Sequence, residues 1–375
     1  MRISIYALIR LTSFLLIILA MMGVTVSRLS PSEKPKWTSD YRQPWSVAQH
    51  LYSPVTKSGL ILDTTSDQEI RIQASHEEIL DLVSISPFQD SDGNRQLVCR
   101  RQVFSGQGKD LAFGPVELAR LRFPDGQIED HRETDWLPNT TPVWDPRVES
   151  GLSCIFSTGA GELIRLDWTD SSGRKVDHRG VRIEWEVEPP FGRGTFVAEP
   201  TWIPGDGNEN RMVVSIWGID GKSGYHVAGL AWLELDSTRS VITNYGLLVQ
   251  YPFQNKQDRR MIRYPMANVS RQGRLITFWY ERDGENHGWN LKSAPLIRNL
   301  TQGDGLKLGK SDTMANGCLA SPVGFNPETE YVYFVVPNSS DCYDGGNWHK
   351  MRYQEKAAVL VASRVMRIRS DRGSE

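Results

Sequence analysis

The sequence predicts an all-β fold, a β-propeller with five recognisable four-stranded blades. Its apolar runs after residue 51 are short and are separated by Gly, Pro, Asn and Asp, which is typical of strands and turns. The dipeptide Asp-Gly, which favours tight hairpin turns, occurs seven times. The runs also recur at a regular spacing along the chain. Together these observations indicate a repeated, strand-based architecture.

The repeat is marked by prolines. Pro87, Pro142, Pro200, Pro265 and Pro322 are 55, 58, 65 and 57 residues apart, and an apolar run begins 9 to 12 residues after each. A third and usually a fourth strand follow in each unit, and four-stranded units that bury their faces against neighbouring units are propeller blades. A β-sandwich would explain the strands but not this period. We expect the prolines at the starts of the innermost strands, where a missing N–H costs least.

The region before the first unit is less regular. Residues 51–73 contain Ser53-Pro54 and the strand-like run GLILDT, and they form either a shortened sixth blade or the strand that closes the ring. Residues 74–82 resemble a helical turn. The predicted propeller domain therefore runs from 51 to 375.

Two stretches resemble a known repeat. TPVWDPRVESGLSCIF, followed by ELIRLDW, and YPMANVSRQGRLITFWYERDGENHGWNL are similar to the repeats of the TolB-like propellers. The resemblance extends over residues 80–368, although no unit carries the full Ser-Pro-Asp-Gly turn. It implies the architecture and transfers no active site, because these propellers serve mostly as binding scaffolds and accessory domains.

The N-terminal segment predicts export. Residues 11–27 are free of charge and follow Arg2 and Arg10, so 1–27 reads as a signal peptide or an N-terminal membrane anchor. A helix of this length rises about 25 Å, against a hydrocarbon core of about 30 Å, which leaves both alternatives open. Residues 28–50 are polar and proline-containing and read as a tether. We expect an extracytoplasmic protein: periplasmic, secreted or anchored to the membrane by residues 11–27.

The charge distribution and the absence of known motifs argue against several classes of function. The 43 basic and 45 acidic residues form no long run of one sign, which argues against nucleic-acid partners. The sequence contains no CxxC, HExxH, GxSxG or P-loop motif, so we expect no cofactor and no metal. His226, His287 and His349 lie in comparable loops and would share a metal only if those loops folded inward. We interpret them as exposed turn residues.

The cysteines divide into two pairs. Cys318 and Cys342 flank a pair of predicted strands and are candidates for a disulfide in an exported protein. Cys99 and Cys154 occupy equivalent positions of two units and read as small core residues.

A ring of polar residues is the first candidate site. Ser86, Thr141, Glu199, Tyr264 and Ser321 each precede a repeat proline, so we expect them near one mouth of the central channel. They predict ligand contacts in a non-enzymatic binding or scaffold module for a protein or glycan partner.

The alternative is a carbohydrate-active enzyme. WDPRVE at Asp145 and FVAEPTW at Glu199 resemble the segments with which five-bladed glycosidases of the arabinan-degrading type present catalytic carboxylates. The resemblance implies that Asp145 and Glu199 are catalytic carboxylates, in a reaction that needs an acid and a base across a sugar ring. The first unit, however, has Ser86 where those enzymes place a base.

Overall fold

The chain divides into two compact units, Met1–Ser39 and Asp40–Glu375, and all described residues belong to the second. The computed structural model describes residues 45–48, 58–63, 68–73, 78–89, 94–106, 112–123, 126–147, 151–205, 207–254, 260–283, 289–299, 305–337, 346–354 and 358–365. In this part of the chain no helix is long and apolar enough to cross a membrane. Residues 11–27, for which a signal peptide or anchor is predicted, lie outside the described residues.

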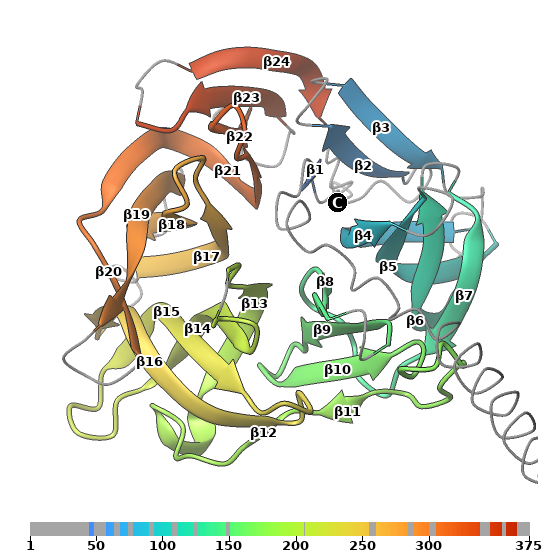
Figure 1. Cartoon of the computed structure of the whole chain (residues 1–375), viewed down its shortest axis with the longest axis horizontal. Coiled ribbons are helices and arrows are strands. Elements are labelled where there is room, and N and C mark those ends of the chain that lie inside the picture. The colour runs from blue at the N-terminus through green and yellow to red at the C-terminus, as the bar shows by residue number, and fades with distance from the viewer. Residues whose placement is uncertain are drawn as a thin grey trace, which may run out of the picture. The chain divides into compact units, whose positions relative to one another are not determined.

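The second unit is a β-propeller, as predicted (Figure 1). Its described strands form five hydrogen-bonded sheets. Four of them contain blades 1 to 5, which are named here after the five repeat units, and the other precedes the blades. Blade 1 is β4 (Glu78–Gln89), β5 (Arg95–Ser105), β6 (Ala112–Phe123) and β7 (Ile128–Glu133). Blade 2 is β8 (Val143–Trp144), β9 (Ser153–Ser157), β10 (Leu163–Asp167) and β11 (Val181–Arg182). Blade 3 is β13 (Phe196–Trp202), β14 (Arg211–Ile219), β15 (His226–Leu235) and β16 (Val241–Phe253), with β12 (Glu184–Trp185) parallel to β16.

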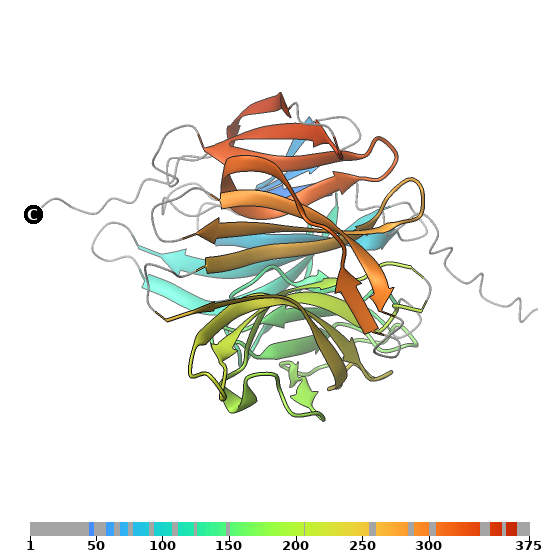
Figure 2. The same cartoon turned by 90° about the vertical axis from the view of Figure 1, so that its left-hand side faces the viewer.

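Blades 4 and 5 share one eight-stranded sheet. Blade 4 is β17 (Arg260–Val269), β18 (Leu275–Asp283), β19 (Trp289–Asn299) and β20 (Gly305–Leu308). Blade 5 is β21 (Asp312–Asn326), β22 (Tyr331–Pro337), β23 (Gly346–Arg352) and β24 (Ala358–Val365). The first half of the long strand β21 pairs with β19 and its second half pairs with β22, which joins the two blades. The strands twist within each sheet, as Figure 2 shows.

A three-stranded sheet precedes the blades. It consists of β1 (Trp45–Ala48), β2 (Ser58–Asp63) and β3 (Gln68–Gln73), paired in sequence order. In the ring it lies between blade 5 and blade 1 (Figure 1). β1 lies inside the range predicted as a polar tether, so the sheet begins earlier than the sequence indicates. The helical turn expected over 74–82 is wrong from Glu78 onward, because these residues pair with β5 as strand β4.

The repeat prolines lie inside the innermost strands, not at their starts as expected. Pro200 and Pro265 are in β13 and β17, where two residues on each strand face one residue of its partner. The registers of β4 and β21 also shift around Pro87 and Pro322, where three and four residues respectively face one residue of the partner strand. A bulge leaves a residue out of the ladder, so a proline there removes no ladder hydrogen bond. Only Pro142 fits the expectation, since it directly precedes β8.

The core lies between the blades. Each blade alternates side chains between its two faces, and both faces are buried against neighbouring blades. One cluster joins Val98 and Leu118 of blade 1 to Trp144, Cys154 and Phe156 of blade 2. Another joins Ile155 and Leu163 of blade 2 to blade 3, and further clusters join blades 3 and 4 and blades 4 and 5. The propeller is therefore stabilised mainly by blade-to-blade packing.

Candidate functional site: an aromatic pocket between blades 3 and 4

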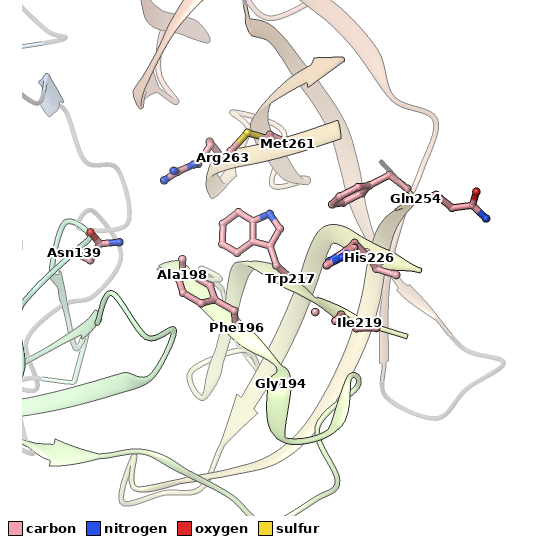
Figure 3. Close-up of a pocket in the computed structure, with 13 residues that line it drawn as sticks. Asn139, Gly194, Phe196, Ala198, Trp217, Ile219, His226, Gln254, Met261 and Arg263 are labelled. Carbon is pink, nitrogen blue, oxygen red and sulfur yellow. The ribbon is translucent and has the colours of Figure 1, made fainter. Parts of the chain in front are cut away.

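A pocket of about 660 Å³ opens at the ends of the blades where β13 and β17 begin. This volume is within the range of about 300 to 1,000 Å³ typical of small-molecule sites. Blade 3 supplies most of its lining, blade 4 supplies Met261 and Arg263, and Asn139 reaches it from the segment before β8 (Figure 3). The pocket is therefore built by three consecutive repeat units.

Strand alternation explains its aromatic wall. Ser215, Trp217 and Ile219 alternate along β14 and so share one face of the strand. Phe196 is the register partner of Trp217, and their rings pack edge to face with centroids 5.3 Å apart. His226 is the register partner of Phe253, and these rings stack at 5.4 Å. Two cross-strand pairs therefore hold the aromatic faces in place.

Gly161 determines where Phe196 can lie. This glycine, in the turn between β9 and β10, has a φ of +79°, a conformation that favours glycine. A Cβ atom there would lie 2.4 Å from the Phe196 ring. Its carbonyl also accepts a hydrogen bond from Val197 N. The turn of blade 2 thus fixes the first residues of β13 and, with them, one side of the pocket.

Arg263 is the charged group of the lining. Its Nη1 donates to Oε1 of Glu199 at 3.0 Å, and its guanidinium carbon lies 5.8 Å from the centre of the Trp217 ring. The Arg263 side chain is 35% exposed, against 4% for Glu199. Burial works against the charge on Arg263, but the Glu199 carboxylate outweighs it and raises the pKa of the guanidinium above its ordinary value. Arg263 therefore carries its charge at the pocket surface.

Glu199 lies behind this surface and is held by three donors. Besides Arg263, its carboxylate accepts hydrogen bonds from Ser215 Oγ at 2.8 Å and from the backbone N of Tyr264 at 2.7 Å. Glu199 and Tyr264 have φ values of 53° and 49°, unusual for residues other than glycine. Both occupy the bulges of their strands, and such bulges redirect side chains. The matching bulges of blades 3 and 4 thus bring Glu199 to the backbone of the next blade.

The five residues of the predicted ring have different surroundings. Glu199 and Tyr264 are brought together, and burial, reinforced by the Glu199 charge, raises the pKa of the Tyr264 phenol so that it stays protonated. Ser86 is fully buried, and its Oγ accepts a hydrogen bond from Gln96 N at 3.0 Å. Thr141 is half-buried, and the side chain of Ser321 lies outside the described part. None of the four described ring residues, Ser86, Thr141, Glu199 and Tyr264, lines the pocket.

Asp145 belongs to a separate network. Its side chain is 2% exposed and pairs with Arg239 and Arg147, each at 3.2 Å. Arg239 is 1% exposed and stacks over Trp202 at 4.4 Å. This network joins blade 2 to the β15–β16 turn of blade 3, because Arg147 also donates to the carbonyl of Ser237. Asp145 and Glu199 share no partner among the described contacts.

The histidines considered as metal ligands, and the cysteines, lie in different environments. His226 lines the pocket, whereas His349 stacks on Phe334 and His287 lies outside the described residues. Within the described part, no three His, Cys, Asp or Glu side chains gather as a metal site would require. Cys99, Cys154 and Cys318 are buried, and burial raises the pKa of the Cys154 and Cys318 thiols to about 12. Cys342, the proposed partner of Cys318, lies outside the described residues.

Sequence reasoning missed the residues that line the pocket. It selected the residue directly before each proline. In blades 3 and 4 the pocket is instead lined by the residue two positions before the proline, Ala198 in blade 3 and Arg263 in blade 4. One signal in the sequence could have indicated the pocket, namely the alternation of Ser215, Trp217 and Ile219 along one strand. It places Trp217 on the same face as Ser215, which donates a hydrogen bond to Glu199. No pattern in one sequence indicates that Phe253 and Arg263 reach the same cavity.

Comparison with known proteins assigns no family. The sequence matches no protein-family model and no curated protein. Among solved structures, a PL25 ulvan lyase is 9% identical with a TM-score of 0.41, covering 85% of this chain and 80% of that chain. An endo-1,4-beta-xylanase from Bacteroides thetaiotaomicron is 8% identical with a TM-score of 0.42, covering 75% and 94%. An arabinanase from Bacillus subtilis is 13% identical with a TM-score of 0.35, covering 70% and 92%. These similarities concern the fold and assign no activity to this chain.

Proposed function

We propose that the protein is a β-propeller binding module that takes a glycan in the pocket between blades 3 and 4. The observation that carries this proposal is the aromatic wall of Phe196, Trp217 and Phe253 around a cavity of about 660 Å³. Aromatic faces pack against the C–H faces of sugar rings, while Asn139, Gln254 and Arg263 offer hydrogen bonds to hydroxyl groups. Such a wall with a few polar groups suits a ring-shaped, hydroxylated ligand.

A glycan array with the full-length protein tests this proposal. We expect the wild type to bind a subset of oligosaccharides and Trp217→Ala to lose about tenfold or more in affinity. The matched control is Trp185→Ala, because Trp185 packs against Tyr245 and does not line the pocket. Equal binding by Trp217→Ala and wild type, or no glycan bound by either, would contradict the proposal.

Hydrolysis of the bound glycan is the second candidate. It is favoured by the position of Glu199, whose neighbour Ala198 lines the pocket and whose partner Arg263 faces it. A glycosidase needs a second carboxylate about 5 to 10 Å away, a role that the resemblance gives to Asp145. Asp145 is instead engaged with Arg239 and Arg147. Release of reducing ends by the wild type but not by Glu199→Gln would establish hydrolysis, and recovery of intact glycan would exclude it.

We further propose that the module works outside the cytoplasm, and that its likeness to TolB-like propellers is limited to architecture. The support for export is the charge-free segment 11–27 that follows Arg2 and Arg10. Fractionation of cells that express the tagged full-length protein tests this. Recovery in the cytoplasmic fraction alone would contradict export.

A further inference from the structure

We infer that the glycan bound in this pocket carries a carboxylate or sulfate group, which Arg263 recognises. This inference rests on the proposed function and specifies its ligand class. Its first support is the charge of the lining. Among the described lining residues Arg263 is the one permanently charged side chain, and none is acidic. The surface that a ligand meets is therefore positive.

The second support is how Glu199 is satisfied. The Glu199 carboxylate accepts two hydrogen bonds that do not involve Arg263, from Ser215 Oγ and from the backbone N of Tyr264. The carboxylate is nearly inaccessible, whereas about a third of the Arg263 side chain is exposed. The pair therefore presents its positive end to the cavity, with the negative end behind the wall.

The third support is the state of the guanidinium. Only Nη1 of Arg263 contacts Glu199, and within the described residues its Nε and Nη2 make no further hydrogen bond. A guanidinium has donors in a fixed fork that fits two oxygens of one carboxylate or sulfate. In Figure 3 Arg263 extends over the Trp217 ring on the side that faces Asn139. The position suits an acidic substituent on a sugar that lies against Trp217.

Neutral ligands would use this site less well. A neutral sugar that covers Arg263 removes water from the guanidinium without supplying a counter-charge, which is costly. A charge-assisted hydrogen bond contributes about 1.5 to 3 kcal/mol, equivalent to about 10-fold to 100-fold in affinity. The preference for acidic over neutral sugars should therefore be large enough to measure directly.

The test compares three forms of one oligosaccharide backbone, neutral, uronic acid-containing and sulfated, titrated against the full-length protein at low and high salt. We expect at least one acidic form to bind about tenfold or more tightly than the neutral form, with the preference reduced by salt. Which acidic form is preferred distinguishes carboxylate from sulfate. Equal affinity for all three forms in the wild type would overturn the inference.

Variants separate this inference from the proposed function. Arg263→Gln should abolish the preference for acidic sugars, and Arg263→Lys should keep part of it because the charge remains. The double variant Arg263→Gln with Glu199→Gln removes both charges and so avoids leaving a buried carboxylate without a cation. Arg260→Gln is the matched control, because Arg260 is on the same strand but does not line the pocket.

The outcomes are distinct. A preference that is lost in Arg263→Gln and in the double variant but kept in Arg260→Gln supports the inference. Binding that depends on Trp217 but shows no acidic preference overturns the inference and leaves the proposed function standing. A preference that persists in the double variant places the recognition elsewhere and also overturns the inference. Failure of every sugar to bind overturns both.

Discussion

Asp145 and Glu199 are both buried acids paired with arginines between adjacent blades, yet their surroundings differ. Arg239, the partner of Asp145, is 1% exposed, whereas Arg263, the partner of Glu199, is 35% exposed. Burial, partly offset by Asp145, lowers the pKa of Arg239, while the Glu199 carboxylate raises that of Arg263. The Asp145–Arg239 pair is therefore enclosed in a blade interface, whereas the Glu199–Arg263 pair presents its cation to a pocket.

Removal of the Asp145 carboxylate should have the largest effect on stability. Asp145→Ala leaves Arg239 buried without its counter-charge, and breaking such a pair costs about 3 to 5 kcal/mol. Denaturant unfolding followed by tryptophan fluorescence measures the free energy of unfolding. Ligand affinity of the folded fraction should be unchanged. A loss below about 1 kcal/mol would contradict the structural role assigned to Asp145.

Arg263→Gln should be less destabilising than Asp145→Ala. Glu199 stays buried but keeps two of its donors, and the Arg263 end of the lost pair is partly exposed, so we expect a loss below the about 3 to 5 kcal/mol of a fully buried pair. The same unfolding experiment provides the comparison. If Arg263→Gln were the more destabilising variant, the contrast between the two networks would be wrong.

Gly161→Ala tests the support of Phe196 from blade 2. The new Cβ would meet the Phe196 ring and would also be strained at a φ of +79°. Gly173 has the same φ with nothing within 4 Å, so Gly173→Ala measures the backbone strain alone, about 1 kcal/mol. We expect Gly161→Ala to lose more stability than this control and to weaken glycan binding. Equal effects of the two variants would show that Phe196 moves aside freely.

The smallest effect concerns pH. Asp236 accepts hydrogen bonds from the N–H groups of Thr238, Ser240 and Val241 in the turn that Arg147 contacts. Burial opposes its charge, but the hydrogen bonds from Thr238 and these N–H groups outweigh burial and lower the pKa of Asp236.

Because the folded-state pKa lies below the unfolded value, the stability from Asp236 is present above about pH 4 and is lost as pH falls through the folded pKa. We expect Asp236→Asn to reduce the acid-dependent loss of stability by a few tenths to about 1 kcal/mol. Urea unfolding from pH 6 to pH 2 measures this. Identical pH profiles of variant and wild type would contradict the assignment.

The sequence predicted the fold better than the site. The spacing of the prolines and the strands that follow them gave the five blades, because each blade repeats the same pattern of apolar runs and turns. The prolines themselves were misplaced, since a bulge inside a strand is indistinguishable in sequence from a strand start. The sequence also predicts the run AAVLVASRV, from Ala357, as the third strand of the last unit, but the third strand is β23 and this run holds the fourth, β24.

The site was harder for a physical reason. Its lining comes from the ends of strands in different blades, and which ends meet depends on packing between blades. Glu199 was selected as a ligand contact for its place before Pro200, and as a catalytic candidate for the resemblance of FVAEPTW to glycosidase segments. The bulge instead turns its carboxylate away from solvent, where three donors hold it. Trp217 lies in an ordinary apolar strand, and Arg263 is one of many arginines. Only the three-dimensional arrangement separates them from core and surface residues.

The most direct test of acidic-glycan binding between blades 3 and 4 is a crystal structure of the full-length protein with an acidic oligosaccharide. We expect a sugar ring against Trp217, with its acidic group within hydrogen-bond distance of Arg263 and with Asp145 still paired to Arg239. A sugar bound between Asp145 and Glu199, or anywhere outside the pocket of blades 3 and 4, would contradict this expectation.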